Sequence, residues 1–232
     1  AVDEGRVREV REQQAERGVG KPGADVTVKP VRAGAGRVVA YSGADGSALF
    51  DVYGEAAGDA LGFSLSALGD YDGSGVSDVL VGAPLSSPMR FGTTTKLKKA
   101  GKVQILAGED GQFLRTVKGQ VAGGQLGFAV TGMQDLNADG QIDFAAGAPY
   151  QSVSYLDPNN KPAKAAGAGS VAIFSGMNGQ ELGRLENPGA GVAYPVPGAH
   201  FGWSLADMGD QDGDGVGDIA VGAPDALGAA GA

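Results

Sequence analysis

Cysteine is absent from the 232-residue chain, and histidine occurs once, at His200. These shortages exclude disulfides, thiolate metal sites and cysteine nucleophiles, and they leave too few imidazoles for a multi-histidine zinc site or a Ser-His-Asp hydrolase. Basic residues are also scarce, because 18 Lys and Arg are set against 27 Asp and Glu. The net charge of −9 argues against nucleic acid and anionic membranes as partners. No apolar run approaches the roughly 18 residues that a membrane-spanning helix needs.

Glycine, by contrast, is abundant. The chain has 42 glycines and 11 prolines, yet 42% of its residues are hydrophobic. Disordered tails do not carry so many apolar side chains. The composition therefore predicts a folded chain with many short elements joined by tight turns.

Two sequence units each occur three times along the chain, which indicates internal repeats. The first unit begins as LGFSLSALGDYDGSGVSDVLVGAP and covers residues 61–84, 126–149 and 201–224. The second begins as GRVVAYSGADG and covers residues 36–46, 101–111 and 169–179. Alternating residues, short apolar runs and Asp-Gly or Asn-Gly turns predict strands in both units. Each full repeat therefore predicts four strands, A to D, as in a β-propeller blade or a β-solenoid coil.

Three joint motifs then give the repeats a family resemblance. A Gly-Phe or Phe-Gly pair is followed by an Asp-rich loop and by Gly-Ala-Pro, at Gly62-Phe63, Gly127-Phe128 and Phe201-Gly202 and at Gly82-Ala83-Pro84, Gly147-Ala148-Pro149 and Gly222-Ala223-Pro224. This combination resembles the FG-GAP repeat of integrin alpha-subunit β-propellers and their bacterial relatives. The resemblance covers about residues 36–224 and implies an all-β fold of propeller blades.

The predicted strands make up about three blades. We expect a half blade at 36–53, blades at 61–118 and 126–186, and a half blade at 201–224, with a short tail at 225–232. Residues 1–35 are predicted to be an arm or linker, with an exposed helix or disordered stretch at 3–17 and at most one or two strands near 26–31. Propellers typically need at least about four blades. A longer parent protein, a second copy or a partner on the open sheet edges is therefore expected.

The Asp-rich loops predict three calcium sites. Oxygen-bearing side chains stand at positions 1, 3, 5 and 9 of each loop, glycine stands at position 6, and position 7 would offer its carbonyl oxygen. The predicted ligands are Asp70, Asp72, Ser74, Val76 and Asp78 in the first loop, Asp135, Asn137, Asp139, Gln141 and Asp143 in the second, and Asp210, Asp212, Asp214, Val216 and Asp218 in the third.

Other interpretations of these loops are weaker. An EF-hand needs a glutamate at position 12, where this chain has Val81, Ala146 and Val221, and it needs flanking helices rather than strands. Magnesium prefers strict octahedral geometry and retained waters. Metal-free Asx-turns remain an alternative, although several carboxylates so close together repel one another without a cation. Ser74 makes the first loop the weakest predicted site, and the third loop is the strongest.

Strand direction sorts the connections onto two faces. The metal loops and the C-to-D turns share one face. The other carries the long connections at 85–100, 150–168 and 187–200, which contain Lys96, Lys98, Lys99, Lys161, Lys164 and Tyr194. The resemblance implies that this second face binds ligand, and long loops on a rigid scaffold favour binding.

The sequence thus predicts a calcium-binding module for extracellular adhesion or protein–protein interaction, without catalytic residues, at an extracellular, cell-surface or periplasmic location. His200 is expected to be a surface residue. Protein partners or self-association are expected through the open edges and the long loops. The alternatives are a scaffold subunit, an accessory domain of a secreted enzyme, or a carbohydrate binder using Tyr150, Tyr155, Tyr194 and Phe91.

Overall fold

The computed structural model describes residues 32–186 and 194–226. The expected helix or arm at 3–17 and the strand near 26–31 lie outside these ranges. Residues from Arg32 onward form one compact unit. The described residues build fourteen β-strands and no helix, which confirms the predicted all-β class. None of these residues belongs to a helix long and apolar enough to cross a bilayer.

The strands form antiparallel sheets in the order of the sequence repeats. A hairpin comes first, made of β1 (Arg37–Tyr41) and β2 (Ala48–Tyr53). A four-stranded sheet follows, in the order β3 (Ser64–Gly69), β4 (Asp78–Ala83), β5 (Lys102–Leu106) and β6 (Phe113–Lys118). The second four-stranded sheet contains β7 (Val130–Gly132), β8 (Phe144–Ala148), β11 (Ser170–Phe174) and β12 (Glu181–Glu186). A last pair joins β13 (Ser204–Gly209) to β14 (Asp218–Gly222).

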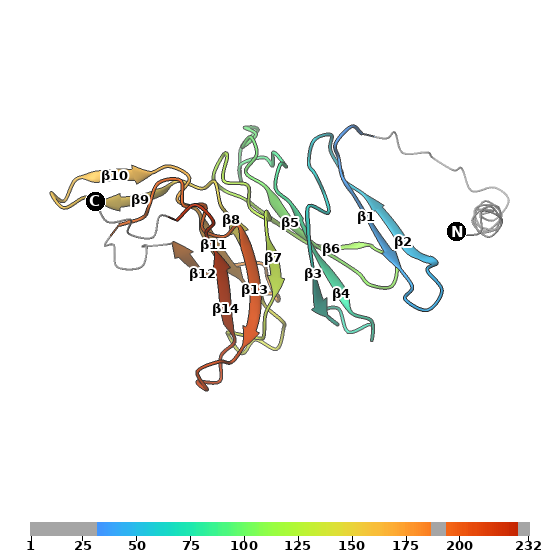
Figure 1. Ribbon diagram of the computed structural model, residues 1–232. Helices are drawn as coiled ribbons and strands as arrows, with labels where there is room; N and C mark the ends of the chain where they lie inside the picture. The colour runs from blue at the N-terminus through green and yellow to red at the C-terminus, as the bar shows by residue number, and fades with distance from the viewer. Residues whose placement is uncertain (1–31, 187–193, 227–232) are drawn as a thin grey trace, which may run out of the picture. The chain divides into compact units, whose positions relative to one another are not determined.

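These sheets are β-propeller blades, two of them complete within the described residues. Each complete sheet is a meander in which the A, B, C and D strands pair only with their sequence neighbours. The first hairpin corresponds to strands C and D, and the last pair corresponds to strands A and B. Figure 1 shows the sheets following one another from β1–β2 to β13–β14.

The connection at 150–168 differs from the expected loop. It contains a two-stranded hairpin of β9 (Val153–Leu156) and β10 (Pro162–Ala165). Its turn is closed by the Asp157 carboxylate, which accepts hydrogen bonds from the backbone amides of Asn159 and Lys161, both at 2.9 Å. Val153 and Ala165 are buried in a small apolar cluster of their own, so the hairpin has its own local packing.

Alternating side chains pack each of the two complete sheets against both of its neighbours. In β8, Phe144 and Ala146 belong to the core shared with the β3–β6 sheet, whereas Ala145 belongs to the core shared with β13–β14. In β4, Leu80 and Val81 likewise point to opposite sides. Strands buried on both faces become continuous apolar runs, which is why the B strands are so rich in Val, Leu, Ala and Phe.

Glycine permits the close approach of successive blades. A Cβ atom at Gly82 would lie 2.0 Å from the carbonyl oxygen of Gly127, and one at Gly147 would lie 2.0 Å from that of Gly202. No side chain fits at such distances. The Gly-Ala-Pro glycine of one blade and the Phe-Gly glycine of the next are therefore the two halves of one contact.

Candidate metal loops and aromatic face

Each Asp-rich loop gathers three carboxylates. Ligand oxygens lie within 4.8 Å of one another in three groups, namely Asp70, Asp72 and Asp78, then Asp135, Asp139 and Asp143, then Asp210, Asp212 and Asp218. Asp214, the predicted fifth-position ligand of the third loop, is not in its group. Its carboxylate accepts a hydrogen bond from the Val216 amide at 2.8 Å. The ligand roles of all the predicted residues stay predictions, those of the clustered aspartates as well as those of Ser74, Asn137 and the three position-7 carbonyls.

The same contact shapes all three loops. The first aspartate of each loop accepts a hydrogen bond from the backbone amide of the glycine at position 6, at 3.0 Å for Gly75, 2.8 Å for Gly140 and 2.9 Å for Gly215. These glycines have φ angles of 86°, 90° and 88°, a left-handed conformation that other residues rarely adopt. The loop thus turns back on itself and brings its carboxylates together.

The last aspartate of each loop ties the loop to the sheet. Asp78 accepts hydrogen bonds from the Tyr71 amide at 2.7 Å and from the Gly108 amide, just after β5, at 2.8 Å. Asp143 accepts equivalent bonds from Leu136 at 2.8 Å and from Gly176, just after β11, at 2.9 Å. Both carboxylate side chains are fully buried.

Among the residues that the structure describes, Asp218 has the first of these two anchors. It accepts a hydrogen bond from the Gln211 amide at 2.7 Å. The described residues contain no C strand after β14, so no counterpart of Gly108 or Gly176 reaches it. Asp218 is accordingly only partly buried.

The electrostatics of the loops suit a hard cation. Burial raises the pKa of Asp143, and the nearby Asp139 and Asp135 charges add to the rise, although two backbone amides oppose it. The Ser175 hydroxyl, which donates to Asp139 at 2.8 Å, lowers the pKa of that carboxyl. Among the described residues, no Lys or Arg forms an ion pair with a loop aspartate. Crowded carboxylates without a basic partner fit an oxygen-seeking divalent ion.

An aromatic cluster lies at the opposite end of the blades. It consists of Phe63, Phe128, Tyr150, His200 and Trp203. The Phe128 ring is 4.7 Å from Phe63 and 4.6 Å from Trp203, measured between ring centres. Tyr150 is 4.9 Å from His200 and 5.9 Å from Phe128. The rings are accessible, because Phe63 is 53% exposed and Trp203 is 38% exposed.

The repeats place this cluster. Phe63 and Trp203 immediately precede the A strands β3 and β13, and Phe128 has the equivalent position before β7. Because the metal loops follow the A strands, the two features lie at opposite ends. His200 is more than the expected surface residue, since it packs on Tyr150 and forms a 2.7 Å contact with Asp225. The sequence signal for the cluster was an aromatic residue at the same position of three repeats.

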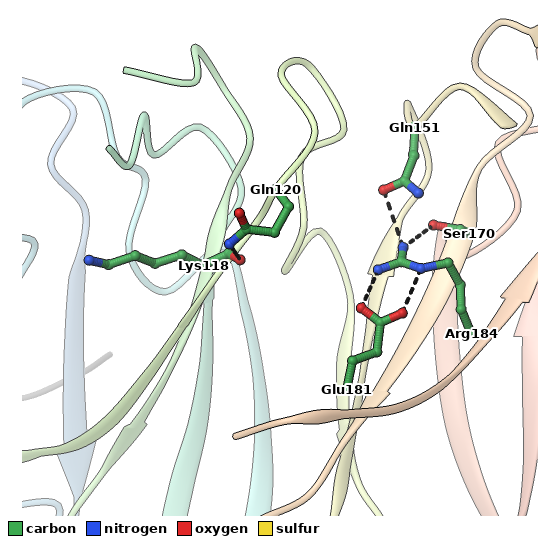
Figure 2. A network of polar contacts seen from close by, with 6 residues as sticks. All are labelled: Lys118, Gln120, Gln151, Ser170, Glu181 and Arg184. Atoms are coloured by element: carbon green, nitrogen blue, oxygen red, sulfur yellow. Dashed lines mark hydrogen bonds and ion pairs between the residues drawn. The ribbon is translucent and has the colours of Figure 1, made fainter. Parts of the chain in front are cut away.

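A polar network around Arg184 has a structural role. The Arg184 guanidinium on β12 pairs with both carboxylate oxygens of Glu181, at 2.5 and 2.7 Å, and donates to Ser170 and Gln151. Figure 2 shows these bonds joining β12, β11 and the segment after β8, with Lys118 and Gln120 nearby. The guanidinium donates to four acceptor atoms, and these bonds fasten β12, the outer strand of the blade, to β11 and to the segment after β8.

Comparison with known proteins agrees with the geometry. No protein-family model matches the chain. Integrin alpha-IIb from Mus musculus is 35% identical over 181 residues, which cover 75% of this chain and 16% of that protein. Integrin alpha-PS2 from Drosophila melanogaster is 32% identical over 190 residues, covering 75% and 12%. Integrin alpha-V from Gallus gallus is 30% identical over 194 residues, covering 81% and 17%.

Fold, loops and relatives point the same way. The packed four-stranded sheets, each with its Asp-rich loop, define a β-propeller region. With these relatives, the repeats are an integrin alpha-type FG-GAP propeller region. The chain spans less than a fifth of the length of these relatives.

Proposed function

We propose that this chain is a calcium-stabilised FG-GAP module that acts outside the cell or at its surface in adhesion-type protein–protein interactions, without a catalytic role. Three calcium ions would occupy the Asp-rich loops. Protein partners would use two parts of the molecule, the aromatic cluster and the open sheet edges. The integrin alpha relatives support this class of function.

The aromatic cluster carries the proposal. Phe63, Phe128, Tyr150, His200 and Trp203 form one continuous group of rings, and part of each outer ring is open to solvent. Soluble proteins seldom leave such a patch without a binding role, and Trp and Tyr supply much of the energy of protein interfaces. Phe63, Phe128 and Trp203 stand just before A strands of the packed sheets, so these rings are held in place before a partner arrives.

Calcium would serve the fold in this proposal. The loops lie at the other end of the blades from the aromatic cluster, and each loop joins an A strand to a B strand. An ion that binds the folded loops and not the unfolded chain stabilises the folded state. Extracellular calcium modules work at about 10⁻⁴ to 10⁻³ M.

Thermal unfolding in calcium and in chelator tests the metal sites. Calcium is expected to raise the melting temperature of the parent chain, and Asp212→Ala is expected to reduce that rise. Glu109→Ala is the matched control, because it removes an exposed acid outside the three groups. Equal melting temperatures of parent and Asp212→Ala under both conditions would reject calcium binding by the third loop.

The single tryptophan allows a direct test of the aromatic cluster. Trp203 is the only tryptophan in the chain, so its emission reports on that patch. Peptides are first selected from a random display library for binding to the parent chain. These peptides are expected to shift the Trp203 emission of the parent and to bind the Phe63→Ala variant more weakly. Phe91→Ala is the control, since Phe91 is 94% exposed and lies in another loop. Peptides that bind both variants equally and leave the emission unchanged would contradict the proposed surface.

A further inference from the structure

The connection from β4 to β5, residues 85–100, concentrates positive charge. It contains Arg90, Lys96, Lys98 and Lys99 and no Asp or Glu, so its formal charge is +4 in a chain whose net charge is −9. All four basic side chains are exposed. Within the described part of the chain, none of them belongs to an ion pair. An unneutralised basic segment on an acidic molecule attracts anionic groups to that one place.

Backbone hydrogen bonds fold this connection into a hairpin. Met89 and Lys96 form an antiparallel β-bridge, and the Leu97 amide donates to the Pro88 carbonyl at 2.8 Å. Side chains alternate between the two sides of paired strands. The side with Pro88 and Leu97, which are buried and half-buried, faces the molecule. Met89 and Lys96 therefore stand on the outer side of this basic hairpin (residues 85–100).

The tip of the basic hairpin holds an aromatic ring in solvent. The Thr93 amide donates to the Arg90 carbonyl at 3.0 Å, and Gly92 has the positive φ of 71° that closes a tight turn. Phe91 stands at the second position of this turn and is 94% exposed, and Met89 is 56% exposed. Single exposed apolar residues are common. Two of them among four cations instead form a surface of mixed apolar and basic character.

The base of the basic hairpin is fixed to the blades. The Lys98 carbonyl accepts a hydrogen bond from the Gly123 amide at 2.8 Å, and the Lys99 carbonyl accepts one from the Gln125 amide at 3.1 Å. The Lys99 amide donates to the Ser87 hydroxyl at 3.1 Å. A partner therefore meets a hairpin whose backbone is already ordered, which reduces the entropy lost on binding.

The hairpin β9–β10 is a natural comparison, because it lies in the equivalent connection of the next blade. That connection, residues 150–168, has Lys161 and Lys164 but also Asp157, so its formal charge is +1. Its turn is closed by the Asp157 carboxylate and presents no aromatic ring. The combination of strong positive charge and an exposed ring is thus particular to the basic hairpin.

From these observations we infer that the basic hairpin binds an acidic polypeptide segment that carries a large apolar side chain among its carboxylates. The carboxylates pair with Arg90, Lys96 and Lys98, and the apolar side chain covers Phe91 and Met89. Aromatic residues and Met are enriched in protein interfaces. This site lies outside the two binding parts named in the proposed function and depends on neither.

The chemistry of the basic hairpin favours a polypeptide over other anions. A sulfated glycan pairs with the cations but offers no apolar group to Phe91. An anionic bilayer accepts an apolar tip but repels a chain that is acidic elsewhere. An acidic segment with an apolar side chain satisfies both halves of the surface.

Defined peptides test the inference by fluorescence anisotropy on the full chain. The probe is a labelled peptide of alternating glutamate and glycine with one central leucine. One control peptide has glutamine for each glutamate, and the other has glycine for the leucine. The parent is expected to bind the probe more tightly than either control peptide, and added salt is expected to weaken the binding.

Matched variants separate the charge from the ring. Lys96→Glu is expected to weaken probe binding about fivefold, whereas Lys161→Glu, the same change at an exposed residue of the other hairpin, should leave it nearly unchanged. Phe91→Ala is expected to weaken probe binding about fivefold but not the binding of the peptide without leucine. Leu156→Ala is its control, because Leu156 is an exposed apolar residue on β9.

Each contrary outcome overturns the inference. Equal binding of the probe and its glutamine version by the parent would do so, as would equal losses in Lys96→Glu and Lys161→Glu. Probe binding that heparin displaces and that is unchanged in Phe91→Ala would assign the hairpin to a sulfated glycan. Tighter, Phe91-dependent binding of phosphatidylserine vesicles would assign it to a membrane.

Two further measurements keep this test separate from the proposed function. Phe63→Ala is expected to bind the probe like the parent, because that ring belongs to the aromatic cluster. The parent is expected to bind the probe equally in calcium and in chelator. A probe that needs Phe63 rather than Phe91 would place the acidic segment on the aromatic cluster and overturn the inference, while leaving the proposed function intact.

Discussion

At the scale of single residues, the aspartates of the Asp-rich loops differ in burial and in the backbone amides that they accept. Asp143 is fully buried and receives two backbone amides, whereas Asp212 is exposed and receives one, from Asp214. Asp143→Asn replaces one acceptor with an NH₂ group that faces a donor. We expect it to lower the free energy of unfolding by about 1–3 kcal/mol even in chelator.

Asp212→Asn is the matched comparison for this prediction. Its side chain stands in water, so its loss is expected to matter only when calcium is present. Urea unfolding of both variants in chelator and in calcium measures the difference. Equal stability of Asp143→Asn and the parent in chelator would show that the two amides do not depend on that carboxylate.

A second residue-scale prediction concerns pH. Lys102 is 4% exposed and pairs with Glu55 at 2.7 Å and with Asp59 at 3.1 Å. The hydrogen bond from Lys102 lowers the pKa of Glu55. A carboxyl with a lowered folded-state pKa adds stability above its unfolded pKa, near 4.3, and loses it as the pH falls through the folded value.

Glu55→Gln is therefore expected to flatten the fall in unfolding free energy below about pH 4.5. Urea titrations at several acidic pH values measure that slope in chelator, where metal binding does not contribute and the loop carboxylates titrate equally in the parent and the variant. Glu109→Gln should retain the slope of the parent. An unchanged slope in Glu55→Gln would mean that the ion pair with Lys102 does not persist in solution.

At the scale of elements, glycine sets the spacing between blades. Gly147→Ala places a methyl group against the Gly202 carbonyl, where the available distance is 2.0 Å. The neighbouring backbone must move, so we expect a loss of at least about 2 kcal/mol in unfolding free energy. Gly183→Ala on β12 is the control, because a Cβ atom there meets nothing within 4 Å. A fully stable Gly147→Ala chain would show that the blades can separate at this contact without cost.

Most of the elements could be predicted from the sequence because the chain repeats itself. Three copies of one pattern located the strands, and the Asp-Gly turns fixed their order. The hairpin β9–β10 occurs in one repeat only, so no second copy supported it, although Asp157-Pro158 is a turn signal. The periodicity of a single segment could not predict that the rings of Phe63, Phe128 and Trp203 lie side by side. These rings come into contact only when three blades pack against one another.

For the metal loops too, the sequence predicted the local arrangement but not the contacts made by distant segments. Their spacing predicted the clustered aspartates, since all the residues of one group lie within nine positions. The anchor of the last aspartate comes from the turn after the C strand, about 30 residues further along, as for Asp78 and Gly108. The loop sequence therefore could not show which last aspartate receives this anchor, which among the described residues is seen for Asp78 and Asp143.

At the scale of the whole molecule, blades stacked in a row resemble a repeat protein, in which each unit contacts only its neighbours. The B and C strands of the complete blades, such as β5 and β8, are buried throughout, whereas the residues of β1 and β14 are mostly exposed or half-buried. Local opening costs least where few buried contacts must be broken. Hydrogen exchange is therefore expected to be slowest in β4, β5, β8 and β11 and faster toward both ends. Uniform protection of all sheets would instead mean that the unit unfolds in one step, with the end blades as firmly held as the middle ones.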